Sequence, residues 1–369
     1  MQRRCRILAV VGTRPEAIKM APLVAALQGA AWASVRLLTT GQHRELMAGA
    51  LADFGLAPDA DLALMQHGQS HEAFDATATA ALRSVFATER PDVVLAQGDT
   101  TTVAATARAC GELGVAFGHV EAGLRSGDLT RPYPEERNRV YVATVASLHF
   151  APTPGARDHL LREGVDPAAV HVTGNTGIDA LLATAARLGP PSPRRDGRRS
   201  VLVTAHRRES FGAPLAAICV AVRALADRGD VEITWPVHPN PQVREPVQRE
   251  LAGVLGVRLV APLGHADMVA AMQQAHVILT DSGGVQEEAP SLGKPVLVLR
   301  DVTERPEGIA AGVARLVGTD AARIVAEAAR LLDDPVAHAA MARGASPYGD
   351  GRAAARIVAA LQAWFAARE

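Results

Sequence analysis

The sequence lacks any long apolar run, since no stretch of its 369 residues approaches the roughly 18–20 apolar residues that cross a bilayer. Arg3, Arg4 and Arg6 make the N-terminus basic, but the apolar stretch at residues 7–11 is too short for the core of a signal peptide. Neither charge dominates: 38 Lys and Arg residues stand against 39 Asp and Glu residues, with no local stripe of cations that could bind nucleic acid. We therefore expect a soluble, cytoplasmic protein with no membrane and no nucleic-acid partner.

Cysteine is scarce as well. The three residues of this type, Cys5, Cys110 and Cys219, lie far apart and form no CxxC pair, which argues against a disulfide scaffold and a structural zinc site. No Asp/His set has the spacing of dedicated metal ligands. The chain also contains no GxGxxG and no GxxxxGK[ST], the usual dinucleotide and Walker fingerprints. We expect neither a metal nor a nicotinamide cofactor.

What the sequence does have is a recurring pattern: a short β-branched run, a turn with Gly or Asp, and an Ala/Leu-rich stretch. Apolar runs that do not alternate with polar residues predict strands buried on both faces, hence parallel strands covered by helices. Strand and helix in alternation predict the doubly wound α/β class. The strand-like runs are residues 6–11, 35–40, 92–96, 115–120, 148–151, 170–173, 201–204, 232–236, 258–260, 277–280 and 296–299.

This pattern passes through the chain twice, which predicts two Rossmann-like domains. We expect an N-terminal domain at residues 1–172, to which a final helix at about 354–369 returns, and a C-terminal domain at residues 173–353. The segment at 188–200 is rich in Pro, Gly and Arg and is typical of a loop. Two such domains form a cleft, and ligands bind beyond the carboxyl ends of their strands, so polar motifs after strands are the candidates for the site.

The first such motif is GTRPEAIK, residues 12–19. Thr13 and Glu16 have the spacing of a capping box, and Pro15 suits the first turn of a helix. A well-made helix start does not explain Arg14, because a bare cation is unfavourable at the positive end of a helix dipole. The pattern therefore indicates a bound anion, such as a phosphate, with Lys19 one turn further in.

Three acidic residues follow later strands of the same half: Asp99 in GDTTT, Glu121 in HVEAGLRSGD and Glu135 in PYPEERNR. At the carboxyl edge of one sheet they could converge and supply an acid and a base. Two simpler interpretations stay open. Asp99 could only cap a helix, and Glu135 could only pair with Arg139 at i, i+4.

In the second half, AHRRESFG follows a strand and presents cations, and DSGG follows another strand and opens a helix. Glycine lets backbone N–H groups approach a ligand, and the start of a helix favours anions. These two motifs therefore indicate an anion site. Its candidate residues are His206, Arg207, Arg208, Ser282, Gly283 and Gly284, with Glu288 available to ribose hydroxyls and Glu304 and Arg305 in the next loop.

Together with DSGGVQEEAPSLGKPVLVLRD and TERPE, these motifs resemble the non-hydrolysing UDP-N-acetylglucosamine 2-epimerases, in that family's order and over nearly the whole chain. The resemblance implies the GT-B arrangement of two Rossmann-like domains with a cleft between them, usually a homodimer, and interconversion of UDP-GlcNAc and UDP-ManNAc, a precursor of cell-surface polysaccharides. Ala205 and Met268 depart from the family's usual Gly and aromatic residue. Some bacterial members bind a second UDP-GlcNAc as an activator near the positions of Gln42 and His43, but Gly68 stands where an Arg is expected.

The resemblance also implies roles for individual residues. Arg14 and Lys19 would contact the phosphates; Asp99, Glu121 and Glu135 would be the acid/base carboxylates, completed by Arg139 and His206; Arg208, Ser282, Gly283, Gly284, Glu288 and Arg305 would hold UDP; and Leu263 and Met268 would line the uracil pocket.

The chemistry of inverting carbon 2 of the sugar limits the possible mechanisms of this reaction. No carbonyl activates the C–H bond at carbon 2 of the sugar, and the missing glycine fingerprint disfavours oxidation by a nicotinamide. Loss of UDP would leave positive charge at carbon 1, which makes the hydrogen on carbon 2 acidic. Removal of that proton would give a 2-acetamidoglucal, which is then protonated at carbon 2 on the opposite face before UDP adds back at carbon 1. The alternatives are a 2-epimerase of a modified substrate, such as a 2,3-diacetamido uronic acid, a GT-B glycosyltransferase, a hydrolysing epimerase and a non-catalytic sensor of sugar nucleotides.

Overall fold

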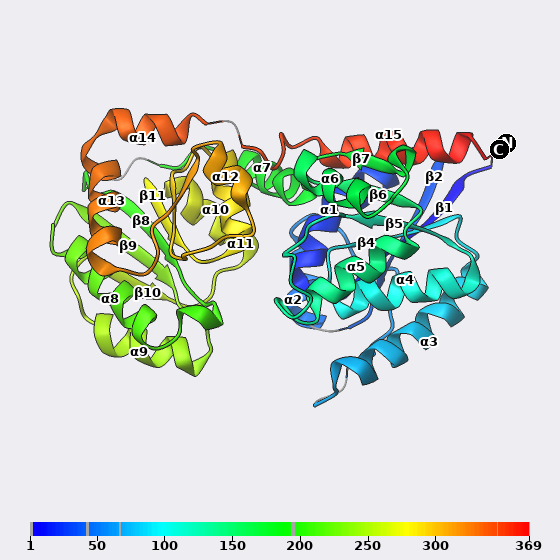
Figure 1. Ribbon diagram of the computed structural model, residues 1–369, viewed down its shortest axis with the longest axis horizontal. Coiled ribbons are helices and arrows are strands. Elements are labelled where there is room, and N and C mark those ends of the chain that lie inside the picture. The colour runs from blue at the N-terminus through cyan, green and yellow to red at the C-terminus, as the bar shows by residue number, and fades with distance from the viewer. Residues whose placement is uncertain (1–2, 42–43, 66–67, 193–195, 345, 369) are drawn as a thin grey trace. The chain divides into compact units, whose positions relative to one another are not determined.

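A computed structural model describes residues 3–41, 44–65, 68–192, 196–344 and 346–368. The chain forms two compact units (Figure 1): unit 1 consists of Met1–Ala180 and Tyr348–Glu369, and unit 2 of Leu181–Pro347. Unit 2 is thus inserted into unit 1 in chain order. The boundaries of independently folding domains, expected at residues 172 and 353, stay a prediction. Gln42 and His43 lie outside the described residues.

Unit 1 is built on a parallel sheet of seven described strands in the order β3-β2-β1-β4-β5-β6-β7. The strands are β1 (Cys5–Val11), β2 (Ala33–Thr39), β3 (Ala60–Asp61), β4 (Val93–Gln97), β5 (Ala116–Val120), β6 (Leu148–Ala151) and β7 (Val170–Val172). The helices are α1 (Arg14–Gln28), α2 (Arg44–Ala52), α3 (His71–Glu89), α4 (Thr101–Leu113), α5 (Glu135–Val145), α6 (Pro154–Arg162), the start of α7 (Thr176–Leu188) and α15 (Ala353–Ala366), with a 3-10 turn at Pro167–Ala169.

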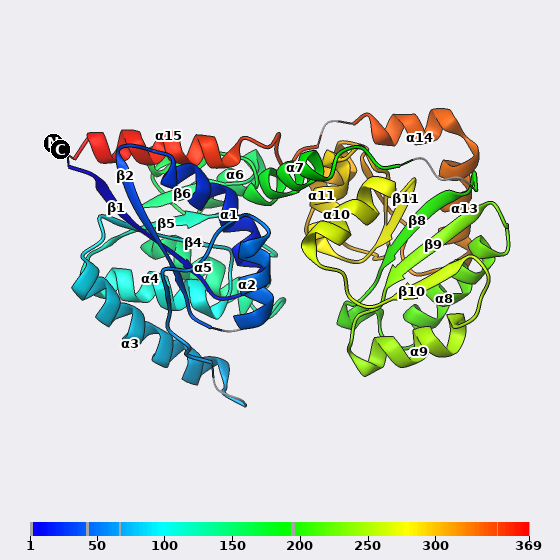
Figure 2. The same ribbon diagram turned by 180° about the vertical axis from the view of Figure 1, so that it is seen from behind.

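Helices cover both faces of this sheet. Along β1, Ile7 and Ala9 pack with α1 and α15, whereas Leu8 and Val10 pack in a separate cluster with α3 and α4. Both ribbon views show the sheet between α15 and α1 on one side and α3 and α4 on the other (Figures 1 and 2). Because both faces of such a strand are buried, apolar residues in its sequence do not alternate with polar ones.

Unit 2 repeats this plan with a parallel sheet whose described strands have the order β10-β9-β8-β11-β12-β13. The strands are β8 (Arg199–Thr204), β9 (Val231–Pro236), β10 (Val257–Val260), β11 (Val277–Thr280), β12 (Val296–Val298) and β13 (Ala314–Leu316). The helices are α8 (Ala213–Ala226), α9 (Pro241–Leu251), α10 (His265–Gln274), α11 (Gly283–Ser291), α12 (Pro306–Ala310), α13 (Ala321–Asp333) and α14 (Pro335–Ala342), with a 3-10 turn at Arg208–Ser210.

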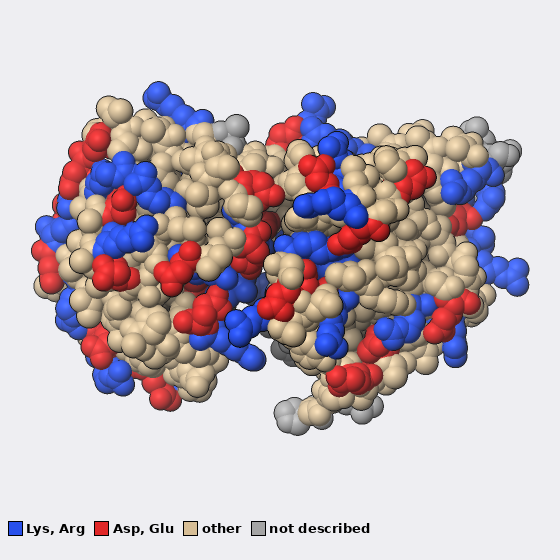
Figure 3. Space-filling model, in the orientation of Figure 1, with Lys and Arg blue, Asp and Glu red and all other residues tan. Residues whose placement is uncertain are grey.

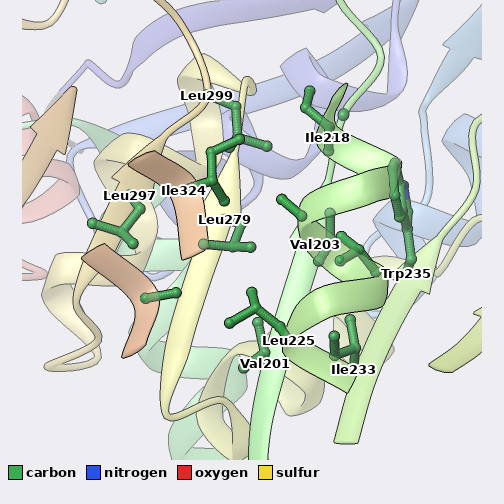
Figure 4. Packing of buried hydrophobic residues seen from close by; sticks show 14 of the residues in the cluster. Val201, Val203, Ile218, Leu225, Ile233, Trp235, Leu279, Leu297, Leu299 and Ile324 are labelled. Carbon is green, nitrogen blue, oxygen red and sulfur yellow. The ribbon is translucent and has the colours of Figure 1, made fainter. Parts of the chain in front are cut away.

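The larger apolar cluster of unit 2 lies between its sheet and helices α8 and α13. Val203 and Leu279 of neighbouring strands face Ile218 of α8 and Ile324 of α13, and Trp235 closes one end (Figure 4). All five side chains are inaccessible to solvent. Full burial of each contributes about 1.5–3 kcal/mol relative to exposure, so this layer fixes the strands whose ends carry the site.

The predicted α/β class and all eleven predicted strands are confirmed, with ends that differ by at most two residues. Two strands were not predicted, β3 and β13, which are two and three residues long. In the described part of the chain, no helix is long and apolar enough to cross a membrane. On the face shown in Figure 3, cations and anions are interspersed, and no continuous basic field is visible there.

The strand order places the candidate residues. In each sheet the order reverses at the centre, between β1 and β4 in unit 1 and between β8 and β11 in unit 2. At such a switch point the connections leave in opposite directions, which opens a crevice beyond the carboxyl ends of the two central strands. The motifs GTRPEAIK and GDTTT follow β1 and β4, and AHRRESFG and DSGG follow β8 and β11.

Candidate active site

In unit 1, the buried carboxylate of Glu16 ties the loops after β1 and β4 together. It accepts the backbone N–H groups of Gly12 and, at 2.9 Å, of Thr13, and it also accepts the hydroxyl of Thr100. Thr100, not Asp99, is the N-cap of α4, since its side chain accepts the N–H of Val103. The cap interpretation of Asp99 is therefore wrong, because the chain turns into the helix one residue later.

Asp99 instead pairs with a cation from α5. An oxygen of Asp99 lies 2.5 Å from Nη2 of Arg139, whose side chain is 14% exposed. The side-chain amide of Asn138 donates to the carbonyl of Asp99 at 2.8 Å. Helix α5 thus holds both the backbone and the carboxylate of this residue.

The alternative interpretation, in which Glu135 only pairs with Arg139, is wrong. Nη1 of Arg139 lies 2.8 Å from the next residue, Glu136, at i, i+3. Oε2 of Glu135 is buried and has no hydrogen-bond partner among the residues that the structure describes. Its carboxyl group therefore has an acceptor oxygen that no group of the described chain occupies.

Glu121 leaves β5 in a left-handed backbone conformation, with φ of 66°. Such a conformation costs a non-glycine residue about 1 kcal/mol or more and marks functional sites more often than it occurs by chance. One oxygen of Glu121 lies 2.5 Å from Nζ of Lys19, and the two side chains are 10% and 19% exposed. Lys19 thus neutralises a candidate acid/base group, beside the phosphate role that the resemblance implies.

His119, which precedes these residues on β5, was not singled out in the sequence. Its Nε2 lies 2.7 Å from the carbonyl oxygen of Gly98, so this nitrogen carries a proton and donates it. Burial lowers the pKa of His119 to about 4, and the ring is neutral at pH 7. A single histidine inside an apolar strand has no spacing signal that could have revealed this contact with the loop of Asp99.

Glu16 provides a testable pH dependence. Burial raises its pKa from 4.5 to about 7, against the opposing hydrogen bonds from Thr100, Gly12 and Thr13. Between pH 4.5 and 7 the unfolded chain has released this proton and the folded chain retains it, so the free energy of unfolding falls as pH rises, by about 2–3 kcal/mol for this group. A glutamine at this position keeps one acceptor oxygen for the N–H groups of Gly12 and Thr13, its NH2 group can donate to the Thr100 hydroxyl, and it does not titrate.

We therefore expect the stability of Glu16→Gln, relative to the unsubstituted protein, to improve steadily as pH rises through this window. Urea unfolding at several pH values measures the difference. Parallel stability curves for the two proteins would contradict the assignment.

In unit 2, the buried carboxylate of Asp281 organises the loop after β8. It accepts the backbone N–H groups of His206 and Arg207, each at 2.9 Å, and the hydroxyl of Ser210 at 2.9 Å. Burial lowers the pKa of His206, although Asp281 opposes the shift, and its ring stacks on that of His238 with centroids 5.6 Å apart. Asp281 was not predicted, although its place directly after β11 is the same signal that drew attention to Asp99.

Helix α11 begins with Gly283, over which Arg305 lies. A Cβ atom at Gly283 would lie 2.4 Å from Cζ of Arg305, so the guanidinium can lie this close only because the residue is glycine, and a larger side chain would displace it. Nε of Arg305 lies 2.7 Å from Glu287, and Nη1 lies 3.1 Å from Glu304. Although burial opposes ionisation of Glu304, the cations Arg305 and Arg300 lower its pKa to about 2. The pairing of Arg305 with Glu287 was not anticipated.

The remaining candidates of unit 2 are distributed around these loops. Ser282 is the N-cap residue of α11, but its hydroxyl makes no capping hydrogen bond. The guanidinium of Arg208 is exposed and makes no ion pair with any described residue. A Cβ atom at Gly284 would meet no atom of another described segment within 4 Å. Glu288 on α11, Leu263 before α10 and Met268 on α10 are half-buried.

In each unit, the structure thus brings the candidates together at the carboxyl edge of its own sheet. Arg14 and Lys19 lie on the first two turns of α1, after β1, and Asp99 and Glu121 follow β4 and β5. Within the described ranges, no group of three or more His, Cys, Asp or Glu side chains could hold a metal ion.

Comparison with known proteins shows which family the chain resembles. Residues 25–362 match the family described as UDP-N-acetylglucosamine 2-epimerase. The UDP-N-acetylglucosamine 2-epimerase of Escherichia coli strain K12 is 48% identical over 369 residues, which cover 97% of this chain and 98% of that protein. The crystal structure of UDP-GlcNAc 2-epimerase from Neisseria meningitidis bound to UDP-GlcNAc is similar with a TM-score of 0.91 and 40% identity, over 97% of this chain and 100% of that one.

A more distant likeness concerns the fold alone. The glycotransferase of kitacinnamycin is only 16% identical but covers 98% of this chain and all of its own, with a TM-score of 0.67. The predicted α/β fold of GT-B type, with two Rossmann-like parallel-sheet units, is confirmed by the strand orders and by these neighbours. Because the family match spans most of the sequence and a relative is 48% identical over nearly its full length, the chain belongs to the UDP-N-acetylglucosamine 2-epimerase family and is an isomerase.

Proposed function

We propose that this protein is a non-hydrolysing 2-epimerase that interconverts UDP-GlcNAc and UDP-ManNAc. The observation that carries the proposal is the pair of carboxylates in neighbouring loops of unit 1, each held by a cation: Asp99 by Arg139 and Glu121 by Lys19. A similar protein from Neisseria meningitidis has been solved with UDP-GlcNAc bound, which supports the choice of substrate. The homodimer and the cytoplasmic location expected from the sequence stay predictions.

The reaction begins with cleavage of the bond between carbon 1 of the sugar and the UDP oxygen, which leaves with the bonding electrons. Positive charge shared by carbon 1 and the ring oxygen acidifies the hydrogen on carbon 2. A carboxylate removes this proton, and the product is 2-acetamidoglucal with UDP. Return of a proton to the opposite face of carbon 2 and addition of UDP at carbon 1 complete the inversion, so atoms and electrons balance without a redox cofactor.

Unit 2 would hold the departing UDP. Arg208 offers an exposed guanidinium, and the N-terminus of α11 at Ser282–Gly284 offers backbone N–H groups that stabilise an anion. Arg14 and Lys19 would add positive charge at the phosphates. The further UDP contacts proposed from the resemblance are Glu288 and Arg305, with Leu263 and Met268 at the uracil.

Unit 1 would supply the proton transfers. The carboxylates of Asp99 and Glu121 can accept the proton of carbon 2. The buried oxygen of Glu135, which has no partner among the described residues, is available to a sugar hydroxyl or to a proton in transit. His206 of unit 2, which the resemblance adds to these groups, can donate or accept a hydrogen bond in its neutral form without adding charge. Together these groups would allow the C–H bond at carbon 2 to be broken without the activation that a neighbouring carbonyl would provide.

A proton NMR time course with UDP-GlcNAc in heavy water tests the proposal. We expect the anomeric signal of the manno isomer to grow, and carbon 2 of the product to carry deuterium, because a carboxylate exchanges its proton with solvent. Retention of the substrate hydrogen would contradict proton transfer through a side chain. Release of free ManNAc would instead identify a hydrolysing epimerase, and a product formed only with an added acceptor would identify a glycosyltransferase. Binding of UDP-GlcNAc without turnover would identify a sensor.

A further inference from the structure

Glu136, the second residue of α5, has no role in the mechanism derived above. Its side chain is almost inaccessible to solvent, with 1% of the residue exposed. Burial of a carboxylate is costly unless every oxygen is paired. The partners of its side chain among the described residues lie in the loop after β5 and on α5 itself.

The two oxygens of Glu136 serve different partners. Oε1 accepts the backbone N–H groups of Ser126 at 2.8 Å and of Gly127 at 3.1 Å, and it thereby fixes the loop that follows Glu121. Oε2 accepts Nη1 of Arg139 at 2.8 Å. Glu136 therefore connects that loop to the guanidinium of Arg139.

Arg139 extends the connection to a candidate acid/base group. Its Nη2 lies 2.5 Å from the carboxylate of Asp99, while its Nη1 is held by Glu136. A guanidinium is planar and rigid, so fixing one of its nitrogens fixes the direction of the other. Without that anchor, the long arginine side chain would regain rotamer freedom, and its contact with Asp99 would be formed only part of the time.

We propose that Glu136 is a positioning residue for the epimerisation: it orients Arg139 against Asp99 and locks the 126–127 loop to α5. This inference rests on the proposed function. It assigns Glu136 no contact with substrate and predicts that its effect on turnover passes through Arg139.

Glu136→Gln is the informative substitution, because an amide has one acceptor oxygen where the carboxylate has two. It can serve either the loop or Arg139, but not both. Since misplacement of a reacting group by about 1 Å can cost roughly 100-fold in rate, we expect kcat to fall by about 10- to 100-fold, with KM for UDP-GlcNAc changed by less than about threefold.

A double-mutant cycle distinguishes this role from a purely structural one. If Glu136 acts through Arg139, Glu136→Gln should change kcat by less than about twofold when Arg139 is already alanine. Equal losses in both backgrounds, or an unchanged kcat in the single variant, would overturn the proposal. Should Glu136→Gln not fold, Glu136→Asp carries the same test, because it keeps both oxygens but is one methylene too short to reach both partners.

Asp92→Asn is the matched control. Asp92 accepts the backbone N–H of Arg6 at 2.8 Å and pairs with Arg3, so it too joins a main-chain donor and an arginine, but at the amino edge of the same sheet. We expect a loss of thermal stability without a loss of kcat. The unsubstituted protein is assayed first: no manno isomer from it would contradict the proposed function, whereas an active protein with an unaffected Glu136→Gln variant would overturn only this inference.

Discussion

Asp99→Asn should lower kcat for epimerisation by about 10²- to 10⁴-fold, the range by which one positioned acid or base accelerates a reaction. The amide has nearly the shape of the carboxylate and can still accept a hydrogen bond from Arg139, so the loop after β4 keeps its anchor on α5. What the substitution removes is the ability to take up a proton. We expect the same of Glu121→Gln, which keeps an acceptor for Lys19.

Turnover measured by the NMR time course, together with thermal unfolding of each variant, checks this prediction. Asp75→Asn is the control, because Asp75 of α3 pairs with Arg108 of α4 at 2.6 Å in the same unit. It removes a comparable ion pair away from the carboxyl edge of the sheet and should leave kcat unchanged. Near-normal epimerisation by both Asp99→Asn and Glu121→Gln would exclude these residues from the acid/base role.

Gly123→Ala should lower the free energy of unfolding by about 3 kcal/mol or more, since backbone strain of about 1–2 kcal/mol adds to overpacking of about 1–3 kcal/mol. Gly123 follows Glu121 by two residues and has φ of +86°. A Cβ atom there would lie 2.2 Å from the carbonyl oxygen and 2.8 Å from the carbonyl carbon of Ala156. Neither atom can move without displacing the start of α6.

The control for this prediction separates strain from collision. Gly164 also has φ of +86°, but a Cβ atom there would lie more than 4 Å from the other segments that the structure describes. Gly164→Ala should therefore cost only the strain, about 1–2 kcal/mol. Urea unfolding of the two variants measures both losses, and equal values would show that the contact with Ala156 relaxes freely.

Much of this fold is predictable from the sequence because the central strands are buried on both faces. Residues 148–151 and 277–280 are uninterrupted or nearly uninterrupted apolar runs, and the structure contains strands with the same bounds, Leu148–Ala151 and Val277–Thr280. The two missed strands, Ala60–Asp61 and Ala314–Leu316, lie at sheet edges and are too short to show a period. These two segments are strands because they pair with the adjacent strand of the sheet, and their own sequences do not indicate this.

The positions of the candidate site residues were predictable for the same reason, since the end of a buried strand marks the edge of the sheet. Their partners were not. Glu135 and Glu136 are adjacent on α5, and helical spacing allows either of them to pair with Arg139, at i, i+4 or at i, i+3. The structure selects Glu136 because helical neighbours point about 100° apart and only one of them faces the 126–127 loop. Which glutamate pairs with the arginine therefore depends on the position of the loop in the folded chain, and sequence spacing does not show that position.

Unit 2 is inserted between the start of α7 and α15, and this order along the chain affects the order in which the two units are synthesised. Ile357, Leu361 and Phe365 of α15 belong to the same apolar cluster as Ile7 and Met20, near the other end of the sequence. A ribosome therefore synthesises all of residues 181–347 before the helix that completes the first core exists. During that interval the β1 and α1 side of unit 1 exposes apolar surface, whereas the sequence of unit 2 is one continuous segment.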